Sequence, residues 1–104
     1  MDLALRALAD GTRRRILTLV WRKERTAGEI ASEFAMTRPA VSQHLTVLRE
    51  SELVLVRRAG VRRFYRANRK AVARIRAELG AFWDDRLIRL RDAAEAVERK
   101  GRRK

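Results

Sequence analysis

The stretch TAGEIASEFAMTRPAVSQHLTVLRESEL, residues 26–53, predicts the fold of the chain. Thr26 and Glu29 have the spacing of a capping box, which opens a first short helix. Thr37, followed two positions later by Pro39, marks the start of a second helix, because Thr is a good N-cap and Pro is tolerated in a first helical turn. The stretch therefore predicts two short helices joined by a tight turn.

The second of these helices has two unlike faces. Val41, Leu45 and Leu48 recur at positions i, i+4 and i+7 and form one apolar stripe, which we expect to be buried. The opposite face carries the side chains of Arg38, Ser42, Gln43 and Thr46. A helix with a buried back and short hydrogen-bonding side chains in front can enter the DNA major groove and contact base edges.

The charge of the chain also favours a nucleic-acid partner. The 104 residues include 26 Lys and Arg against 13 Asp and Glu, a formal net charge of +13. Such a surplus on one small domain indicates a polyanionic partner. An anionic membrane is the alternative, but no stretch approaches the roughly 18 apolar residues of a spanning helix. The N-terminus lacks the features of a signal peptide, so we expect a cytoplasmic protein.

Further elements are predicted on both sides of this stretch. A short helix over 2–9 presents Leu3, Leu5 and Leu8, and Asp10 can cap a second helix over 11–23. After residue 53 the apolar period changes, and residues 53–58 and 61–66 predict a β-hairpin whose two-residue loop is Ala59-Gly60. Either Val54, Val56 and Tyr65 or their neighbours of opposite parity pack on the helices, and the sequence leaves this parity open.

The hairpin is rich in arginine. Its arms and tip carry Arg57, Arg58, Arg62, Arg63 and Arg66. Guanidinium groups so close together repel one another unless an anion lies alongside. We therefore expect at least two of Arg57, Arg58, Arg62 and Arg63 to contact DNA phosphates.

A long last helix is predicted from about Arg69 to about Lys100. From Trp83 onward its apolar residues are spaced 4, 3, 4, 3, the a/d pattern of a coiled-coil seam. A second copy of the chain is the simplest cover for such a seam. The residues expected at this dimer interface are Leu3, Leu5, Leu8, Leu79, Phe82, Trp83, Leu87 and Leu90. Residues 1–98 then form one DNA-binding and dimerisation domain, and residues 99–104 form a basic flexible tail.

The order helix, helix, helix-turn-helix, basic hairpin, long helix resembles the ArsR/SmtB family of bacterial winged-helix repressors. The resemblance is carried by LADGTRRRIL at 8–17, TAGEIASEFAMTRPAVSQHLTVLRESELV at 26–54 and RRAGVRRFYRA at 57–67. It implies a mainly α fold with a small β-hairpin, a winged helix-turn-helix with a long C-terminal dimerisation helix. It is nearest to the branch of the family that lacks obvious metal ligands.

The resemblance also implies how the protein works. The second helix of the helix-turn-helix would enter the major groove of double-stranded DNA, and the hairpin would be a wing touching the backbone. The groove-facing positions carried over are Arg38, Pro39, Ser42 and Gln43, with Thr46 nearby, and Thr37 and Arg49 are placed for phosphates. The homodimer would be held by the first and last helices, and its symmetry implies a near-palindromic operator.

Two positions depart from the family pattern. Family members often have Pro where this chain has Gly11, and Gly where it has Glu52. If the second site requires a left-handed backbone, Glu52 costs about 1–2 kcal/mol there.

Metal sensing, enzymatic activity and cofactor binding are not supported by the sequence. The chain has no Cys and a single His, His44, so the thiolate and imidazole ligands that transition metals prefer are missing. We expect His44 to be a partly buried residue hydrogen-bonded near the neighbouring helix. No nucleophile–base pair and no glycine-rich phosphate loop is present. The prediction is a homodimeric, sequence-specific transcriptional repressor whose effector is unknown, and the alternative is a sequence-tolerant DNA-coating protein.

Overall fold

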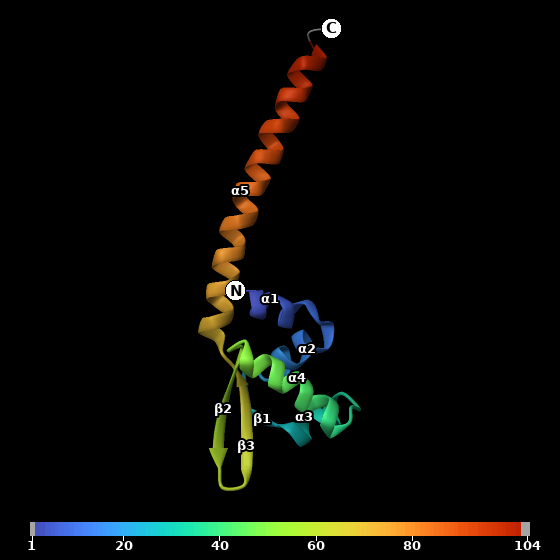
Figure 1. The fold of residues 1–104 in the computed structure, drawn as a ribbon, viewed down its shortest axis with the longest axis vertical. Coiled ribbons are helices and arrows are strands. Elements are labelled where there is room, and N and C mark those ends of the chain that lie inside the picture. Colours follow the sequence, from blue (N-terminus) through green and yellow to red (C-terminus); the bar gives the residue numbers. More distant parts are fainter. Residues whose placement is uncertain (1, 103–104) are drawn as a thin grey trace. The chain divides into compact units, whose positions relative to one another are not determined.

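The computed structural model describes the backbone of residues 2–102 and the side chains of residues 2–99. The elements follow the chain in the order α1 (Asp2–Ala9), α2 (Gly11–Leu19), β1 (Arg25–Thr26), α3 (Ala27–Glu33), α4 (Arg38–Glu50), β2 (Val54–Ala59), β3 (Arg62–Ala67) and α5 (Arg69–Arg102) (Figure 1). Residues 1–73 and 74–104 form two compact units. Among the described residues, no helix is long and apolar enough to cross a bilayer.

The first unit is built around the helix-turn-helix formed by α3 and α4. Helix α4 contacts α1, α2, α3 and β2, so it lies at the centre of this unit. The largest fully buried side chains come from α2, α3, α4 and the segments that follow α2 and α4: Ile16, Val20, Ile30, Val41, Leu45, Leu48 and Leu53. The apolar stripe predicted for the second helix therefore forms the middle of the core, and its removal from water is the main force that seats the helix.

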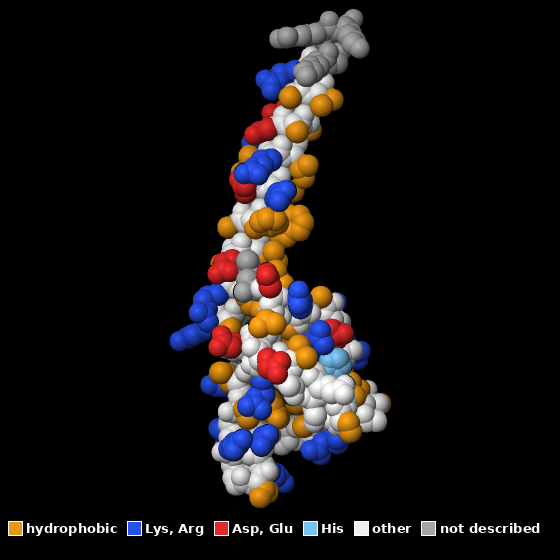
Figure 2. All heavy atoms as spheres, viewed as in Figure 1, with side chains coloured by type: hydrophobic (Ala, Val, Ile, Leu, Met, Phe, Trp, Pro, Cys, Tyr) orange, Lys and Arg blue, Asp and Glu red, His pale blue; other side chains and the backbone are white. Residues whose placement is uncertain are grey.

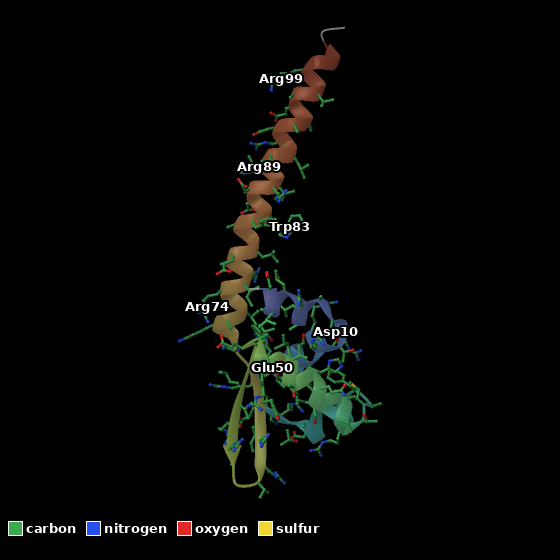
Figure 3. The ribbon with its side chains drawn as sticks, viewed as in Figure 1. Asp10, Glu50, Arg74, Trp83, Arg89 and Arg99 are labelled. Carbon is green, nitrogen blue, oxygen red and sulfur yellow. The ribbon has the colours of Figure 1, made fainter. Side chains whose placement is uncertain are left out.

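The predicted caps of these helices are confirmed. Thr26 Oγ1 accepts from the backbone N–H of Glu29 at 3.2 Å, and the Glu29 carboxylate accepts from the Thr26 N–H at 3.2 Å. Thr37 Oγ1 accepts from the backbone N–H of Ala40 at 3.3 Å, and Asp10 accepts from the N–H of Arg13 at 2.9 Å. Asp10 lies at the junction of α1 and α2 (Figure 3).

Helix α2 is shorter than predicted, because it ends at Leu19 rather than Lys23. The carbonyl of Val20 accepts from the N–H of Ala67 at 3.0 Å. The carbonyl of Trp21 accepts from the guanidinium group of Arg69. Both carbonyls thus bond to partners far along the chain and not to the next helical turn. The helix therefore ends, and the chain continues into β1.

The sheet has three strands in the order β1-β3-β2, all antiparallel. Strand β1 was not predicted, because two residues carry no periodic pattern. The hairpin loop is Gly60-Val61 and not Ala59-Gly60, since Ala59 pairs with Arg62. Gly60 has φ +61°, so the first loop position carries the backbone conformation that glycine adopts without strain.

The hairpin residues that face the helices are Val54, Val56 and Tyr65, the first of the two alternatives left open by the sequence. Val54 and Tyr65 are buried, Val56 is half-buried, and Leu55 on the other face of β2 is 42% exposed. Val54, Val56 and Tyr65 continue the core formed by α4, whereas the arginines on both faces of the hairpin are exposed.

The helix-turn-helix uses a left-handed residue at the end of each helix. Ala35 after α3 has φ +51° and Glu52 after α4 has φ +61°. After α4, the N–H of Glu52 donates to the carbonyl of Arg49 at 2.9 Å and that of Leu53 to Leu48 at 2.8 Å, which is a Schellman motif. The backbone at Glu52 is therefore left-handed, which answers the question that the sequence left open at this position.

Helix α5 begins at an Asn cap, because Asn68 Oδ1 accepts from the N–H of Ala71 at 3.2 Å. It has 34 residues, a length of about 51 Å at the usual rise. From residue 74 onward it forms the second unit, where Phe82, Trp83, Leu87, Ile88, Leu90 and Val97 are between 48% and 70% exposed. Hydrophobic side chains are visible along the helix (Figure 2), and Trp83 projects from it (Figure 3).

The residues expected at a dimer interface are only partly covered in the single chain. Leu3 is 64% exposed, and Leu5, Leu8 and Leu79 are half-buried. The predicted tail, 99–104, begins within α5, which is helical to Arg102. The last two residues of that tail lie outside the described part of the chain.

Candidate nucleic-acid interface

The outer face of α4 is fully exposed. Its inner residues are buried, whereas all seven side chains predicted to face DNA are exposed: Thr37, Arg38, Pro39, Ser42, Gln43, Thr46 and Arg49. The helix is 13 residues long, which gives about 20 Å of surface. This arrangement meets the steric requirement for entering a major groove.

Local hydrogen bonds limit what two of these side chains can offer. The hydroxyl oxygen of Thr37 already accepts from the N–H of Ala40. The hydroxyl of Thr46 donates to the carbonyl of Ser42 at 2.9 Å. The Thr46 proton is thus used within the helix, and its methyl group is what remains for a contact with a thymine methyl. Gln43 and Arg38 keep their hydrogen-bonding groups for other partners.

A polar groove lies between α3, α4 and the hairpin. It has a volume of about 600 Å³ and is lined by Thr26, Gly28, Glu29, Arg38, Ser42, Arg62 and Arg63 among others. A Cβ atom on Gly28 would lie 3.1 Å from the Nη1 atom of Arg38. The absence of a side chain at Gly28 therefore lets the Arg38 guanidinium lie across the start of α3. The groove brings arginines of α4 and of the hairpin to one surface.

The hairpin carries five exposed arginines, of which Arg58, Arg62 and Arg63 lie nearest its tip. Arg58 lies directly opposite Arg63 across the two strands. Like charges in opposed positions are destabilising, so this pair favours an anionic partner. Within the described residues, none of these three guanidinium groups forms a hydrogen bond or an ion pair. Basic side chains gather over the hairpin in the space-filling view (Figure 2).

Arg57 behaves differently from its neighbours. Its guanidinium group donates to both carboxylate oxygens of Glu24 and lies over the ring of Phe64. The hydrogen bond from Arg57 lowers the pKa of Glu24 and raises the pKa of Arg57. Arg57, one of the four predicted wing arginines, is therefore already bound to Glu24 of the same chain.

His44 lies on the side of α4 that faces α2, as expected. Its Nδ1 atom is 3.5 Å from the Arg13 guanidinium and 4.0 Å from the Asp10 carboxylate. The N–H of Arg13, and then the charges of Arg13 and His44, hold the pKa of Asp10 below its ordinary value. Among the described residues, no group of three or more His, Asp or Glu side chains is placed to hold a metal ion.

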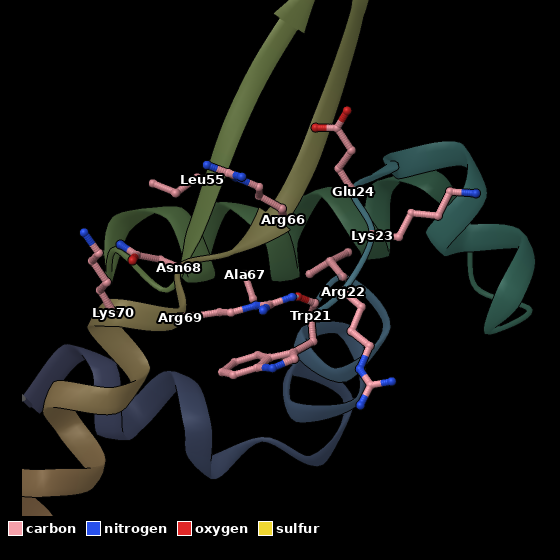
Figure 4. A pocket seen from close by; sticks show the side chains of 11 residues that line it. Trp21, Arg22, Lys23, Glu24, Leu55, Arg66, Ala67, Asn68, Arg69 and Lys70 are labelled. Carbon is pink, nitrogen blue, oxygen red and sulfur yellow. The ribbon is translucent and has the colours of Figure 1, made fainter.

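A second groove lies at the base of the hairpin (Figure 4). It has a volume of about 750 Å³, and its lining includes Trp21, Arg22, Lys23, Glu24, Leu55, Arg66, Arg69 and Lys70. Arg69 donates from Nε to the Trp21 carbonyl at 2.8 Å and stacks over the Trp21 ring at 5.6 Å. Sequence patterns gave no signal for Glu24 or Arg69, because their partners Arg57 and Trp21 are distant along the chain. The N-cap role of Asn68, by contrast, was open to prediction from its place before a helix.

Comparison with known proteins agrees with this geometry. Residues 10–55 match the family model described as "Bacterial regulatory protein, arsR family". The chain is 45% identical over 82 residues to the HTH-type transcriptional regulator Rv2034 of Mycobacterium tuberculosis, covering 79% of this chain and 77% of the relative. It is 37% identical over 68 residues to the transcriptional repressor SdpR of Bacillus subtilis, covering 65% of this chain and 76% of that repressor.

A solved structure supports the same assignment. The homodimeric winged helix-turn-helix DNA-binding domain of Mb0332 from Mycobacterium bovis, described as a possible ArsR-family transcriptional regulator, superposes with a TM-score of 0.66. The two sequences are 34% identical, and the match covers 81% of this chain and 78% of that one. The winged helix-turn-helix fold and the family resemblance predicted from the sequence are confirmed: the chain belongs to the arsR family of bacterial regulatory proteins.

Proposed function

We propose that this transcriptional regulator binds double-stranded DNA as a homodimer and represses transcription at a near-palindromic operator. The observation that carries the proposal is the exposed outer face of α4, whose back is buried and whose neighbour is the arginine-bearing hairpin. Its two named relatives are a transcriptional regulator and a transcriptional repressor, and neither is an enzyme. We expect the protein to act in the cytoplasm, where the chromosome lies.

The interface divides into two kinds of contact. We assign base contacts to Arg38, Ser42, Gln43 and Thr46, with Pro39 against the groove wall. Gln43 has the geometry to pair with adenine and Arg38 with guanine. We assign phosphate contacts to Thr37, Arg49, Arg58, Arg62 and Arg63, which lie at the ends of α4 or on the hairpin. Phosphate contacts fix the position of α4, and base contacts then select the sequence.

The proposed dimer uses the apolar surfaces of α1 and α5. Its contact residues are Leu3, Leu5, Leu8, Leu79, Phe82, Trp83, Leu87 and Leu90, and the exposed Ile88 adds to the same helix. Large apolar side chains in a row on an exposed helix favour burial against another protein surface. A two-fold dimer places two copies of α4 about one helical turn of DNA, roughly 10 bp, apart.

The proposal includes no metal sensing through Cys and His. The chain contains no Cys, and its single His is held beside Asp10 and Arg13 at the junction of α2 and α4. The effector, if one exists, must therefore act through other side chains.

The proposal is tested by selecting ligands from a randomised 30-bp duplex library and measuring affinity by fluorescence anisotropy. A regulator binds the selected duplex about 10³-fold or more tightly than a scrambled duplex of equal composition. A DNA-coating protein, the alternative, binds both with similar affinity. Equal affinities would reject sequence-specific binding.

A further inference from the structure

The contact between Glu24 and Arg57 is the only ion pair among the described residues that links the hairpin to another element. Arg57 Nε lies 3.1 Å from both carboxylate oxygens of Glu24, and Arg57 Nη2 also donates to Oε1. Two donors on one edge of the guanidinium group therefore meet one carboxylate. This side-on geometry restricts orientation as well as distance.

The flat face of the same guanidinium group is also in use. It lies 4.6 Å from the centroid of the Phe64 ring, and Phe64 is the residue opposite Arg57 across the two strands. A cation over an aromatic face is attracted by the ring electrons. With its edge on Glu24 and its face on Phe64, Arg57 has little freedom to turn toward a ligand.

Glu24 is itself attached to the start of the helix-turn-helix. The next two residues form β1, where Arg25 pairs with Tyr65 and Thr26 pairs with Phe64. Thr26 is also the N-cap of α3. The Glu24 carboxylate therefore connects the outer strand of the hairpin, β2, to the segment that begins the helix-turn-helix.

The pairing between β1 and β3 ends at Phe64, the residue opposite Arg57. Strand β1 reaches Phe64 and no farther, so residues 58–63 project as a two-stranded hairpin. A two-stranded hairpin is marginally stable alone. Its direction depends on what holds its base, and at that base the Glu24–Arg57 contact ties β2 to the segment that precedes α3.

We infer that Glu24 and Arg57 form a brace that sets the direction of the hairpin, and that Arg57 is a positioning residue and not a phosphate contact. The inference rests on the proposed function. Arg58 is the matched contrast: it is adjacent in sequence and exposed like Arg57, but it lies opposite Arg63 and has no acidic partner in the described part of the chain. Arg58 is free to bind a phosphate, whereas Arg57 would first have to leave Glu24.

The test compares Glu24→Gln, Arg57→Gln, their double variant and Arg58→Gln in the full chain. Affinity for the duplex selected with the wild-type protein is measured by anisotropy between 50 and 300 mM KCl, a range of about sixfold in salt. Each phosphate contact contributes about 0.9 to the slope of log K against log salt. Arg58→Gln, present twice in a dimer, then flattens the slope by about 1.8.

The brace predicts that variants of Glu24 and Arg57 change the affinity for DNA but not its salt dependence. Arg57→Gln and Glu24→Gln each weaken binding by about fivefold, at the upper end for an exposed ion pair, and neither changes the slope. The double variant is no weaker than either single one, because both remove the same contact. A loss of DNA affinity with Glu24→Gln distinguishes the brace from a simple charge effect, since removal of a negative charge near DNA would otherwise strengthen binding.

Two results would overturn the inference. Tighter binding and a steeper slope with Glu24→Gln would show that Glu24 competes with DNA for Arg57. A flatter slope with Arg57→Gln, like that of Arg58→Gln, would show that Arg57 contacts phosphate. Failure of the wild-type protein to select any duplex would instead reject the proposed function.

The brace is also tested without DNA. Backbone ¹⁵N{¹H} NOE values of residues 58–63 in the free protein should fall in Glu24→Gln and in Arg57→Gln, and should recover in the charge-swapped variant Glu24→Arg/Arg57→Glu. Amides elsewhere should keep their values, which shows that the variants fold. Unchanged NOE values over 58–63 would reject the brace whatever the DNA measurements show.

Discussion

The side-chain amide of Asn68 donates to the main-chain carbonyl of Glu52, with an Nδ2–O distance of 3.0 Å. Asn68 also donates its backbone N–H to the carbonyl of Leu53 at 2.8 Å and caps α5 through Oδ1. One residue thus joins the end of the recognition helix α4, the end of the hairpin and the start of α5. This junction explains how a left-handed glutamate is kept at position 52.

Replacing Glu52 by glycine should stabilise the protein. Glu52 has φ +61°, where a side chain costs about 1–2 kcal/mol, and part of that gain is lost to the greater freedom of glycine in the unfolded chain. We expect the free energy of unfolding in urea to rise by about 1 kcal/mol. Glu50→Gly, at the last residue of α4, is the matched control and should lower it by roughly 0.5 kcal/mol. A loss of stability in Glu52→Gly would mean that the glutamate side chain makes a compensating contact.

The Asn68 side chain has two functions, as donor to the Glu52 carbonyl and as N-cap of α5, and the loss of each should lower stability separately. Asn68→Asp keeps an oxygen to cap α5 but removes the donor to Glu52, and we expect a loss of about 1 kcal/mol. Asn68→Ala removes the cap as well, and we expect a loss of about 2 kcal/mol. Urea denaturation of the two variants measures the difference. Equal losses would assign the whole effect to the hydrogen bond with Glu52.

Gly28→Ala should weaken DNA binding without reducing stability. The new Cβ would lie 3.1 Å from Nη1 of Arg38 and displace its guanidinium group. A side chain forced from its preferred rotamer costs about 0.5–1.5 kcal/mol, so affinity should fall about twofold to tenfold, while thermal unfolding is unchanged or improved. In an Arg38→Ala background the same substitution should have no further effect. An equal loss in both backgrounds would show that Gly28, and not Arg38, matters to the DNA.

Leu87→Asp should convert the proposed dimer into monomers. The substitution places a charge among the apolar side chains that we assign to the dimer interface, where an unpaired carboxylate is costly to bury. Sedimentation velocity measures the change. Ala81→Asp adds the same charge to α5 at an exposed position off the a/d seam and should leave the dimer intact. Intact dimers in Leu87→Asp would place the interface on another surface.

Local chemistry explains which parts of the fold were predictable. The caps at Asp10, Thr26 and Thr37 involve residues three positions apart, and the buried stripe of α4 repeats within a few turns, so the residues themselves carry the signal. The family resemblance marked position 52 as one where Gly is common, and the structure shows that its backbone is left-handed. The caps and the buried stripe depend on short stretches of chain, so they can be predicted without the tertiary structure.

The features that were missed depend on distant partners. Helix α2 ends at Leu19 because Ala67 and Arg69 bind the carbonyls that follow it. Strand β1 has two residues and exists only through its pairing with β3. Arg57 looked like its neighbours in sequence, and only the fold shows Glu24 beside it, 33 residues away. Tertiary pairing of this kind leaves no periodic pattern to read.

The proposed division of contacts assigns the base edges to α4 and the phosphate backbone to the hairpin. It is tested most directly by competition binding of Gln43→Ala and Arg62→Ala on a panel of duplexes carrying single base substitutions in the selected site. We predict that Gln43→Ala relaxes the preference at one position of each half-site, and that Arg62→Ala weakens binding to every duplex alike with its preferences unchanged. The reverse result, with relaxed preference in Arg62→Ala and uniform weakening in Gln43→Ala, would contradict the claim.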